Sequence, residues 1–277
     1  MRQSAVYPFR YYGGKVQILS WLINQFPKSF SFVDVFGGSG VVSLNVVDRY
    51  KRVVWNDIDR NVVNFFKVLR DDSEELIRLI ELTPVARDEH LAAWEYSDYP
   101  VENARRFFVR MTQSFNNYGL KGRCSWLGGS LESKKSRAGY VFARVKGLEE
   151  VVRRLQHIEI ENKPFHDLIE KESHPDNFFF VDPPYLNSTR NGSAYAHDMT
   201  DDEHERLFRM LDQSPANAVV CGHRSDLYDD LYKSWTRKEH IINNAYVAQR
   251  GCDPQRTEVV WIKNHYPTNQ QCALFED

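Results

Sequence analysis

The most distinctive chemistry in the sequence lies in Asp182-Pro183-Pro184-Tyr185, directly after an apolar run. That run, Phe178–Val181, predicts a buried strand, so the carboxylate stands at a strand end. The two prolines fix the backbone and lack an N–H, which leaves carbonyl groups free as acceptors. Asp182 and the Pro183 carbonyl can therefore bind the two N–H bonds of an exocyclic amine.

Such an arrangement suits methyl transfer to the amine nitrogen. The lone pair of this nitrogen is delocalised into the base, and two acceptors would draw the nitrogen toward a tetrahedral shape. The lone pair then points at an incoming methyl group, which is catalysis by positioning and electrostatics. Tyr185 could stack on a base swung out of a helix. The alternative interpretation is a proline-rich strand exit, with Asp182 as a cap and Tyr185 in the core.

A second group of residues could hold a nucleoside. The run Phe36-Gly37-Gly38-Ser39-Gly40 follows an apolar stretch, and glycine lets a ligand approach the backbone closely. Asp57 follows about 20 residues later, where a carboxylate can bind both hydroxyls of a ribose. The spacing is not the full G-x-G-x-x-G, which favours an adenosyl ligand without pyrophosphate. Asp57 could also cap the helix that follows it.

Apolar runs that alternate with helical patterns predict an α/β fold with a mainly parallel sheet. The expected strands are Phe30–Phe36, Arg52–Asp57, His157–Asn162, Phe178–Asp182, Asn217–Gly222, Glu239–Asn243 and Glu258–Lys263. Helices are expected at Gln17–Phe26, Val41–Tyr50, Arg60–Leu69, Glu203–Leu211 and Asp226–Ser234.

Residues 71–156 interrupt this alternation and are expected to form a mostly helical insert. Its expected helices are Ser73–Leu82, Asp88–Tyr96, Asn103–Asn116 and Ala143–Gln156, with a basic stretch rich in Gly and Ser at Asn117–Tyr140. The predicted organisation is a catalytic domain made of residues 1–70 and 157–277, with residues 71–156 inserted.

Together these motifs resemble the Dam-like, D12 class N6-adenine DNA methyltransferases. Arg10-Tyr11-Tyr12-Gly13-Gly14-Lys15 is similar to the K-W-A-G-G-K of that family, with Tyr11 in place of Trp. Phe36–Gly40 resembles the family's F-x-G-x-G, and the insert and D-P-P-Y follow in the family's order. The resemblance implies a Rossmann-like methyltransferase sheet with an antiparallel last strand.

The resemblance also implies S-adenosylmethionine as cofactor. The residues that it implies for cofactor contact are Tyr11, Lys15, Phe36, Gly38, Gly40, Asp57, Phe165, Asp167 and Asp182. The catalytic residues that it implies are Asp182, Pro183, Pro184 and Tyr185.

Double-stranded DNA is the partner implied, and residues 71–156 would recognise the target. The expected DNA-binding residues are Asn116, Asn117, Lys121, Arg123, Lys134, Lys135 and Arg137, because their side chains can bind phosphates or base edges. A solvated charged face is the alternative for the basic ones. Members that read GATC carry a Phe-Asn-Val-Pro segment that this insert lacks, so GATC is not predicted.

The predicted function is site-specific methylation of N6 on a flipped-out adenine in double-stranded DNA. Cytosine N4 in DNA, adenine in RNA, and DNA binding without catalysis are the alternatives. No apolar run reaches the ~20 residues that span a bilayer. The cysteines and histidines lack metal-ligand spacing. We expect no metal, a monomer or weak dimer, and a cytoplasmic location in a prokaryote or phage-infected cell.

Overall fold

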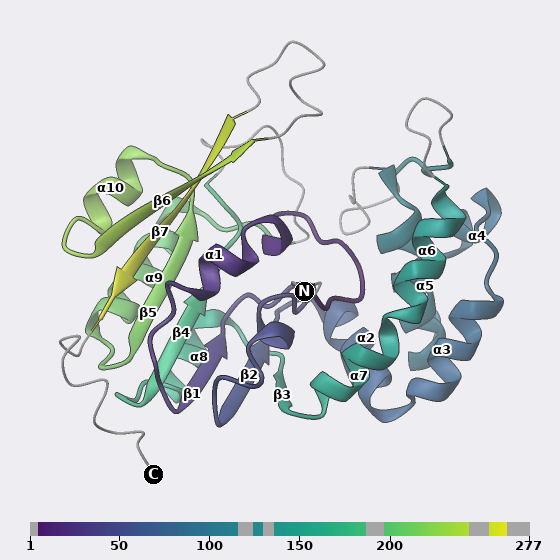
Figure 1. Ribbon diagram of the computed structural model, residues 1–277, viewed down its shortest axis with the longest axis horizontal. Coiled ribbons are helices and arrows are strands. Elements are labelled where there is room, and N and C mark those ends of the chain that lie inside the picture. Colours follow the sequence, from purple (N-terminus) through teal and green to yellow (C-terminus); the bar gives the residue numbers. More distant parts are fainter. Residues whose placement is uncertain (1–4, 116–123, 130–135, 187–196, 244–254, 265–277) are drawn as a thin grey trace.

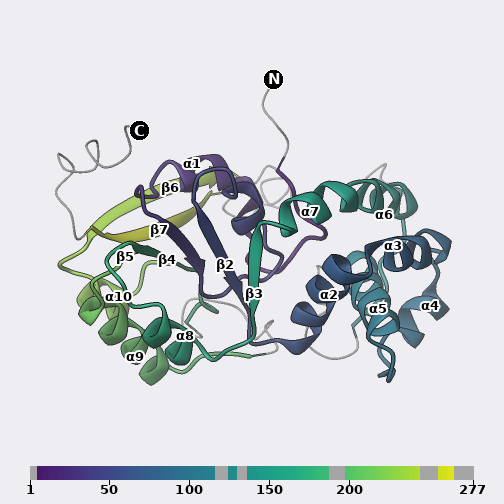
Figure 2. The same cartoon turned by 90° about the horizontal axis from the view of Figure 1, so that it is seen from below.

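The computed structural model describes residues 5–115, 124–129, 136–186, 197–243 and 255–264, in which a seven-stranded sheet has helices on both faces. A further group of helices lies beyond one edge of the sheet (Figures 1 and 2). The strands are β1 (Ser31–Asp34), β2 (Arg52–Asn56), β3 (Ile158–Glu161), β4 (Asn177–Val181), β5 (Asn217–Gly222), β6 (Thr236–Asn243) and β7 (Gln255–Lys263).

Ten α-helices and two short 3₁₀ helices are present in the described residues. The helices are η1 (Lys15–Gln17), α1 (Leu19–Ile23), η2 (Ser43–Asn45), α2 (Arg60–Asp71), α3 (Ser73–Leu82), α4 (Arg87–Ala92), α5 (Pro100–Gln113), α6 (Arg137–Lys146), α7 (Leu148–Leu155), α8 (Phe165–Lys171), α9 (Asp201–Gln213) and α10 (Asp226–Leu231). Among the helices described here, a search for long apolar segments finds none that could cross a membrane.

Five neighbouring strands are parallel, in the order β3-β2-β1-β4-β5. The last strand, β7, runs antiparallel to both of its neighbours, β5 and β6. The predicted sheet, mainly parallel with an antiparallel last strand, is confirmed. The insertion of β7 between β5 and β6 is a long-range pairing that local sequence patterns do not encode.

The two faces of the sheet carry different helices because successive side chains in a strand point to opposite sides. Phe32 and Phe178 belong to a core that includes residues of α1, α2, α5 and α7. Val33 and Phe179 belong to a second core, formed with α8, α9 and α10. Both faces of the central strands are thus covered, which explains their nearly continuous apolar sequences.

The helix predicted at Val41–Tyr50 is wrong, since only the short 3₁₀ helix η2 forms there. Valine is a poor helix former, and four valines occupy this stretch. The side chain of Asn45 also binds backbone that a helix would use. Its amide donates to the carbonyls of Val6 (2.8 Å) and Val41 (2.7 Å), and its oxygen accepts from the Val6 N–H (3.1 Å).

Two further differences from the prediction concern a break within a helix and an additional helix. The helix predicted at Ala143–Gln156 is two helices, α6 and α7, which meet at Gly147. Glycine is the weakest helix former after proline, so a break at this residue is unsurprising. The sequence patterns also do not predict α8, which has seven residues and follows Pro164.

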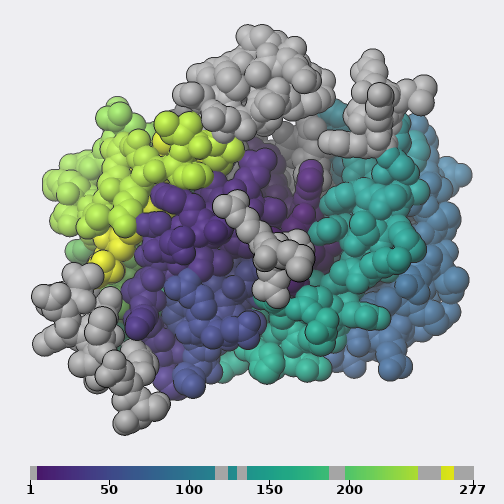
Figure 3. All heavy atoms as spheres, viewed as in Figure 1, coloured from purple at the N-terminus to yellow at the C-terminus, as the bar shows by residue number. Residues whose placement is uncertain are grey.

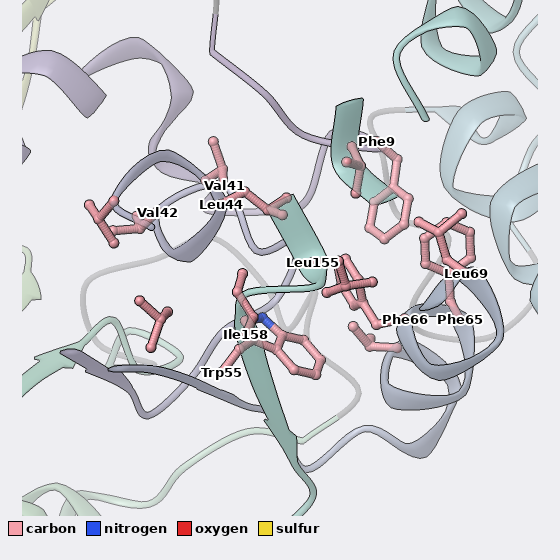
Figure 4. Packing of buried hydrophobic residues seen from close by; sticks show 14 of the residues in the cluster. Phe9, Val41, Val42, Leu44, Trp55, Phe65, Phe66, Leu69, Leu155 and Ile158 are labelled. Carbon is pink, nitrogen blue, oxygen red and sulfur yellow. The ribbon is translucent and has the colours of Figure 1, made fainter. Parts of the chain in front are cut away.

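The sheet and the outlying helices share one apolar core. Figure 4 shows Phe65 and Phe66 of α2 on the side that faces Phe9 and Trp55. The Phe9 ring is edge-on to Phe65 (centroids 5.1 Å apart) and to Phe107 of α5 (5.4 Å), and Trp55 of β2 contacts Phe66 (4.7 Å). The N-terminal segment is therefore fixed between the sheet and the helical group.

The buried side-chain amide of one asparagine links the loops at the ends of three neighbouring strands by hydrogen bonds. Asn56, which is 1% exposed, ends β2 and donates to the carbonyls of Val35 (2.9 Å) and Lys163 (3.1 Å). Its side-chain oxygen accepts from the Lys163 N–H (2.8 Å). Three loops, after β1, β2 and β3, are held in one place by this side chain.

Asn56→Ala should lower the free energy of unfolding by about 2–4 kcal/mol, because it leaves buried backbone groups without partners. For a chain of this length that corresponds to a melting temperature lower by roughly 5–12 °C, measurable by thermal unfolding. Asn24→Ala, at an exposed position after α1, is the control and should change little. Equal melting temperatures for the two variants would contradict this role of Asn56.

Candidate active site

Three carboxylates meet at the carboxyl ends of neighbouring parallel strands. Asp34 ends β1, Asp57 follows β2 and Asp182 follows β4, and the register pairs Asp34 with residues near the ends of both neighbours. All three line one cavity of about 340 Å³. That size lies within the range of small-molecule sites, and open α/β sheets bind ligands beyond the carboxyl ends of their strands.

The glycine loop after β1 forms one wall of the cavity. The Gly37 N–H donates to the Asn56 carbonyl (2.7 Å), and a Cβ on Gly37 would lie 2.0 Å from Nε1 of Trp55. Gly38 has a φ of 49° and lies against the Tyr11 ring, where a Cβ would be 3.0 Å from ring carbons. Side chains are therefore excluded here, and a ligand can reach the backbone.

Asp57 is held by the backbone on both of its oxygens. Oδ2 accepts from the Gly38 N–H (2.8 Å) and Oδ1 accepts from the Asp59 N–H (2.8 Å). Burial raises its pKa to about 6, against the lowering effect of these hydrogen bonds. The cap of α2 is Asp59, whose Oδ1 accepts from the Asn61 N–H (2.8 Å), so Asp57 does not serve as that cap.

Asp34 belongs to the site but was not among the residues that the motifs single out. Its Oδ2 accepts from the Ser43 hydroxyl (2.6 Å), and its buried Oδ1 has no hydrogen-bond partner among the described residues. Burial raises the pKa of Asp34 to about 8, with the charges of Asp182 and Asp57 acting in the same direction. A lone acidic residue at the end of an apolar strand is the signal that could have identified it.

Asp182 forms an ion pair with the lysine of the N-terminal motif. Lys15 Nζ lies 2.6 Å from Asp182 Oδ2, and the lysine is 4% exposed. The other oxygen, Oδ1, is buried and has no hydrogen-bond partner among the described residues. Burial raises the pKa of Asp182, and Lys15 opposes that rise.

The rest of the Asp-Pro-Pro-Tyr motif divides between cavity and core. Pro184 lines the cavity, whereas Pro183 and Tyr185 do not. Tyr185 is 5% exposed, and its hydroxyl donates to Glu258 Oε2 (2.9 Å) on β7. Its ring is edge-on to His223, with centroids 4.5 Å apart. In this structure Tyr185 anchors the motif to β7, two strands away from β4, and does not line the cavity.

Apolar side chains line the cavity near Asp57. Phe36 and Phe165 lie with ring centroids 6.0 Å apart, and Ile58 is 39% exposed. Tyr11 also lines the cavity. Two predicted cofactor residues, Gly40 and Asp167, do not line the cavity. The Gly40 N–H donates to the Gly37 carbonyl within the glycine loop, and Asp167 on α8 is more than half exposed beside His166. The structure also adds Asp198 and the first turns of α9 to the lining, which the motifs do not indicate.

Arg137 lies at the start of α6 in a cluster of arginine and tyrosine side chains. The guanidinium carbons of Arg137 and Arg10 lie 5.1 Å and 5.8 Å from the centroid of the Tyr140 ring. Arg144 lies 4.5 Å from the Tyr7 ring. Figure 3 shows the N-terminal residues, in purple, at the centre of one face beside α6 and α7 in teal. The cluster therefore bridges the N-terminal motif and the helical group.

The other predicted DNA-binding residues lie outside the described residues. They are Asn116, Asn117, Lys121, Arg123, Lys134 and Lys135. Among the residues that the structure does describe, no group of three His, Cys, Asp or Glu side chains could hold a metal ion.

The sequence profile of the D12 class N6 adenine-specific DNA methyltransferases matches residues 11–248 of this chain. The type II methyltransferase M.MjaIII of Methanocaldococcus jannaschii is 26% identical, over 85% of this chain and 91% of its own length. M1.LlaDCHI of Lactococcus lactis is 24% identical over 91% of this chain and 94% of that protein. M.CviBI of Paramecium bursaria Chlorella virus NC1A is 22% identical over 91% and 97%.

The raised pKa of Asp34 predicts a stability that depends on pH. Because the folded pKa, about 8, lies above the ordinary 3.8, folding takes up a proton between these values, and stability falls as the pH rises through about 8. Asp34→Asn, which keeps an acceptor for Ser43, should melt above the wild type near pH 8. The difference should shrink toward about pH 5, where a carboxyl with this raised pKa is already protonated.

Thermal unfolding across this pH range measures the effect, with Asp230→Asn, at an exposed position of α10, as the control. A melting-temperature difference that is the same at every pH would show that the Asp34 carboxyl does not titrate in this range.

Proposed function

Because the chain belongs to the D12 class N6 adenine-specific DNA methyltransferases, we propose that its cavity binds S-adenosylmethionine beside the adenine that is methylated. Family membership makes the chain an adenine-specific DNA methyltransferase. The proposal adds the cofactor, the residues that hold it and the surface that receives the DNA. The observation that carries it is that Asp182, whose buried Oδ1 has no hydrogen-bond partner among the residues described, lines the same cavity as Asp57 and the glycine loop.

The chemistry of the cavity fits S-adenosylmethionine. Asp57 would bind the ribose hydroxyls, and Phe36, Phe165 and Ile58 would contact the adenine ring of the cofactor. The methionine portion is cationic, and a bound cation would favour the ionised form of Asp34, whose buried Oδ1 has no hydrogen-bond partner among the described residues. When bound, the cofactor supplies an electrophilic methyl group.

The residues after β4 would prepare the amine for attack. Asp182 Oδ1 would accept one N–H of the target amino group, and the proline backbone of the motif, which has no N–H of its own, offers carbonyl acceptors for the other. Both acceptors are held rigidly, so the nitrogen is oriented before the reaction and not during it. Tyr185 would act through its anchor to Glu258, which fixes the motif against β7.

The second part of the proposal concerns the surface that binds DNA, which includes the Arg–Tyr cluster. We assign recognition of the target sequence to residues 71–156. We assign binding of the DNA phosphate backbone to the cluster of Arg10, Arg137 and Arg144 with Tyr7 and Tyr140. Guanidinium groups placed against aromatic rings are ordered while still able to bind phosphate oxygens. The cluster adjoins the motif that carries Tyr11 and Lys15, so bound DNA would lie next to the cavity.

Asp182→Ala and Asp182→Asn should reduce methyl transfer to DNA by at least ~10²-fold, because each removes the carboxylate that accepts from the amine. Purified protein, DNA and labelled cofactor are incubated, and the modified nucleoside is identified by mass spectrometry. N6-methyladenine is the expected product of the wild type, and Asp230→Ala is the matched control.

Full activity in both Asp182 variants would refute the assignment of Asp182. Methylcytosine as the sole product would refute the adenine assignment. Calorimetry with S-adenosylmethionine separates the two sites, since Asp57→Ala should lose cofactor binding while Asp182→Asn keeps most of it.

Arg10→Ala and Arg137→Ala should each weaken DNA binding and lower the slope of log K against log salt concentration by about 1, because each removes one phosphate contact. Cofactor binding should not change. Arg209→Ala, an exposed arginine on α9, is the control. Unchanged salt slopes in both variants would contradict a phosphate-binding role for the cluster.

A further inference from the structure

The Lys15 ammonium lies in a buried setting with several electron-rich neighbours. Nζ is 2.6 Å from Asp182 Oδ2, donates to the Gly13 carbonyl at 2.7 Å, and lies 5.0 Å from the centroid of the Tyr185 ring. Gly13 adopts a φ of 74°, a conformation that glycine tolerates, in the turn that presents its carbonyl. A buried ammonium needs such partners, so the charge is held in place.

The ion pair makes the two oxygens of Asp182 unequal. Oδ2 is bound by Lys15, while Oδ1 is buried without a hydrogen-bond partner in the described part of the chain, in a residue that lines the cavity. A carboxylate that is ion-paired at one oxygen cannot rotate freely, so the direction of its other oxygen is fixed. This is the geometry that an acceptor for a single N–H requires.

The groups around Asp182 would otherwise oppose its ionisation. The titratable groups that interact with it are Lys15 of η1, Asp34 of β1, Cys221 of β5, Tyr228 of α10, Glu258 of β7 and Tyr185 of the motif itself. Burial raises the pKa of Asp182 and the charge of Glu258 adds to the rise, whereas Lys15 and, less strongly, a hydrogen bond with Tyr185 lower it. Loss of the ammonium would leave a buried acid among other acids, and protonation would follow.

We propose that Lys15 is a positioning residue for methyl transfer: it holds Asp182 by Oδ2, so that a charged Oδ1 faces the target amine. This inference rests on the proposed function of Asp182. It differs from the cofactor contact that the family resemblance implies for Lys15, because the partner in the structure is the catalytic carboxylate. A charged carboxylate draws an N–H more strongly than a neutral acid does.

Two variants separate this role from others. Lys15→Met keeps the length and the apolar stem of the side chain but removes the charge, and Lys15→Arg keeps the charge. In Lys15→Met the pKa of Asp182 rises, so less of it is ionised at a given pH. The acid limb of the single-turnover rate should move to higher pH, and the rate at neutral pH should fall on the order of 10²-fold.

The rate of Lys15→Met should recover as the pH increases, and Lys15→Arg should restore the position of the acid limb. Carboxyl ¹³C NMR of the protein without DNA or cofactor follows the titration of Asp182 directly, with Asp182→Asn used to assign its signal. This measurement does not depend on methylation, so it can succeed even if the proposed function fails. Thermal unfolding confirms that each variant is folded.

Three results would overturn the proposal. One is an Asp182 titration that is the same in Lys15→Met and in the wild type. Another is a rate that falls equally at every pH, together with a proportional loss of S-adenosylmethionine affinity in calorimetry, which would make Lys15 a cofactor ligand. The last is a Lys15→Arg protein that folds, but in which the acid limb of the pH–rate profile lies at the same pH as in Lys15→Met.

Discussion

Burial of negative charge at the ends of the strands is the constraint on which the rest of the site depends. Asp34, Asp57 and Asp182 lie in one cavity, and burial is the largest influence that raises the pKa of each. The three carboxyls are compensated in different ways. Asp57 has two backbone donors, Asp182 has Lys15 and Tyr185, and Asp34 has the Ser43 hydroxyl and the backbone of Phe36. Oδ1 of Asp34 and Oδ1 of Asp182 are buried without a hydrogen-bond partner in the described part of the chain, which is unfavourable. Under the proposed function, the cationic cofactor and the target amine would offset this cost.

The N-terminal segment links these three carboxyls to the arginine–tyrosine cluster. Phe9 is packed between α2 and α5, Tyr11 lies against the glycine loop, and Lys15 reaches Asp182. Arg10, between Phe9 and Tyr11, points instead toward Tyr140 of α6. A few consecutive residues thus contact the shared core, the cavity and the arginine cluster. Because these contacts lie on one short stretch of chain, DNA bound as proposed at the cluster would lie in a defined position relative to a ligand in the cavity.

Tyr185 illustrates how context changes the role expected of a motif residue. Its position in the motif suggested stacking on a base, but in this structure the hydroxyl is bound by Glu258 and the ring packs beside His223. Glu258 lies on β7, which is distant in sequence and reaches the motif only because β7 is inserted next to β5. The antiparallel strand therefore supports the Asp-Pro-Pro-Tyr motif as well as extending the sheet.

The sequence alone determined the elements and motifs whose signals are local. All seven strands were predictable because they contain apolar or β-branched residues in continuous or alternating runs, and the glycine loop, Asp57 and Asp182 could be recognised by type and spacing. The strand order, the absence of an α-helix at Val41–Tyr50 and the partners of Asp34 and Lys15 were decided by the tertiary structure. They depend on contacts between distant segments, such as Asn45 with Val6 and Lys15 with Asp182. Burial and pairing arise only when the strands come together, so a residue's charge state and partner cannot be obtained from its neighbours in sequence.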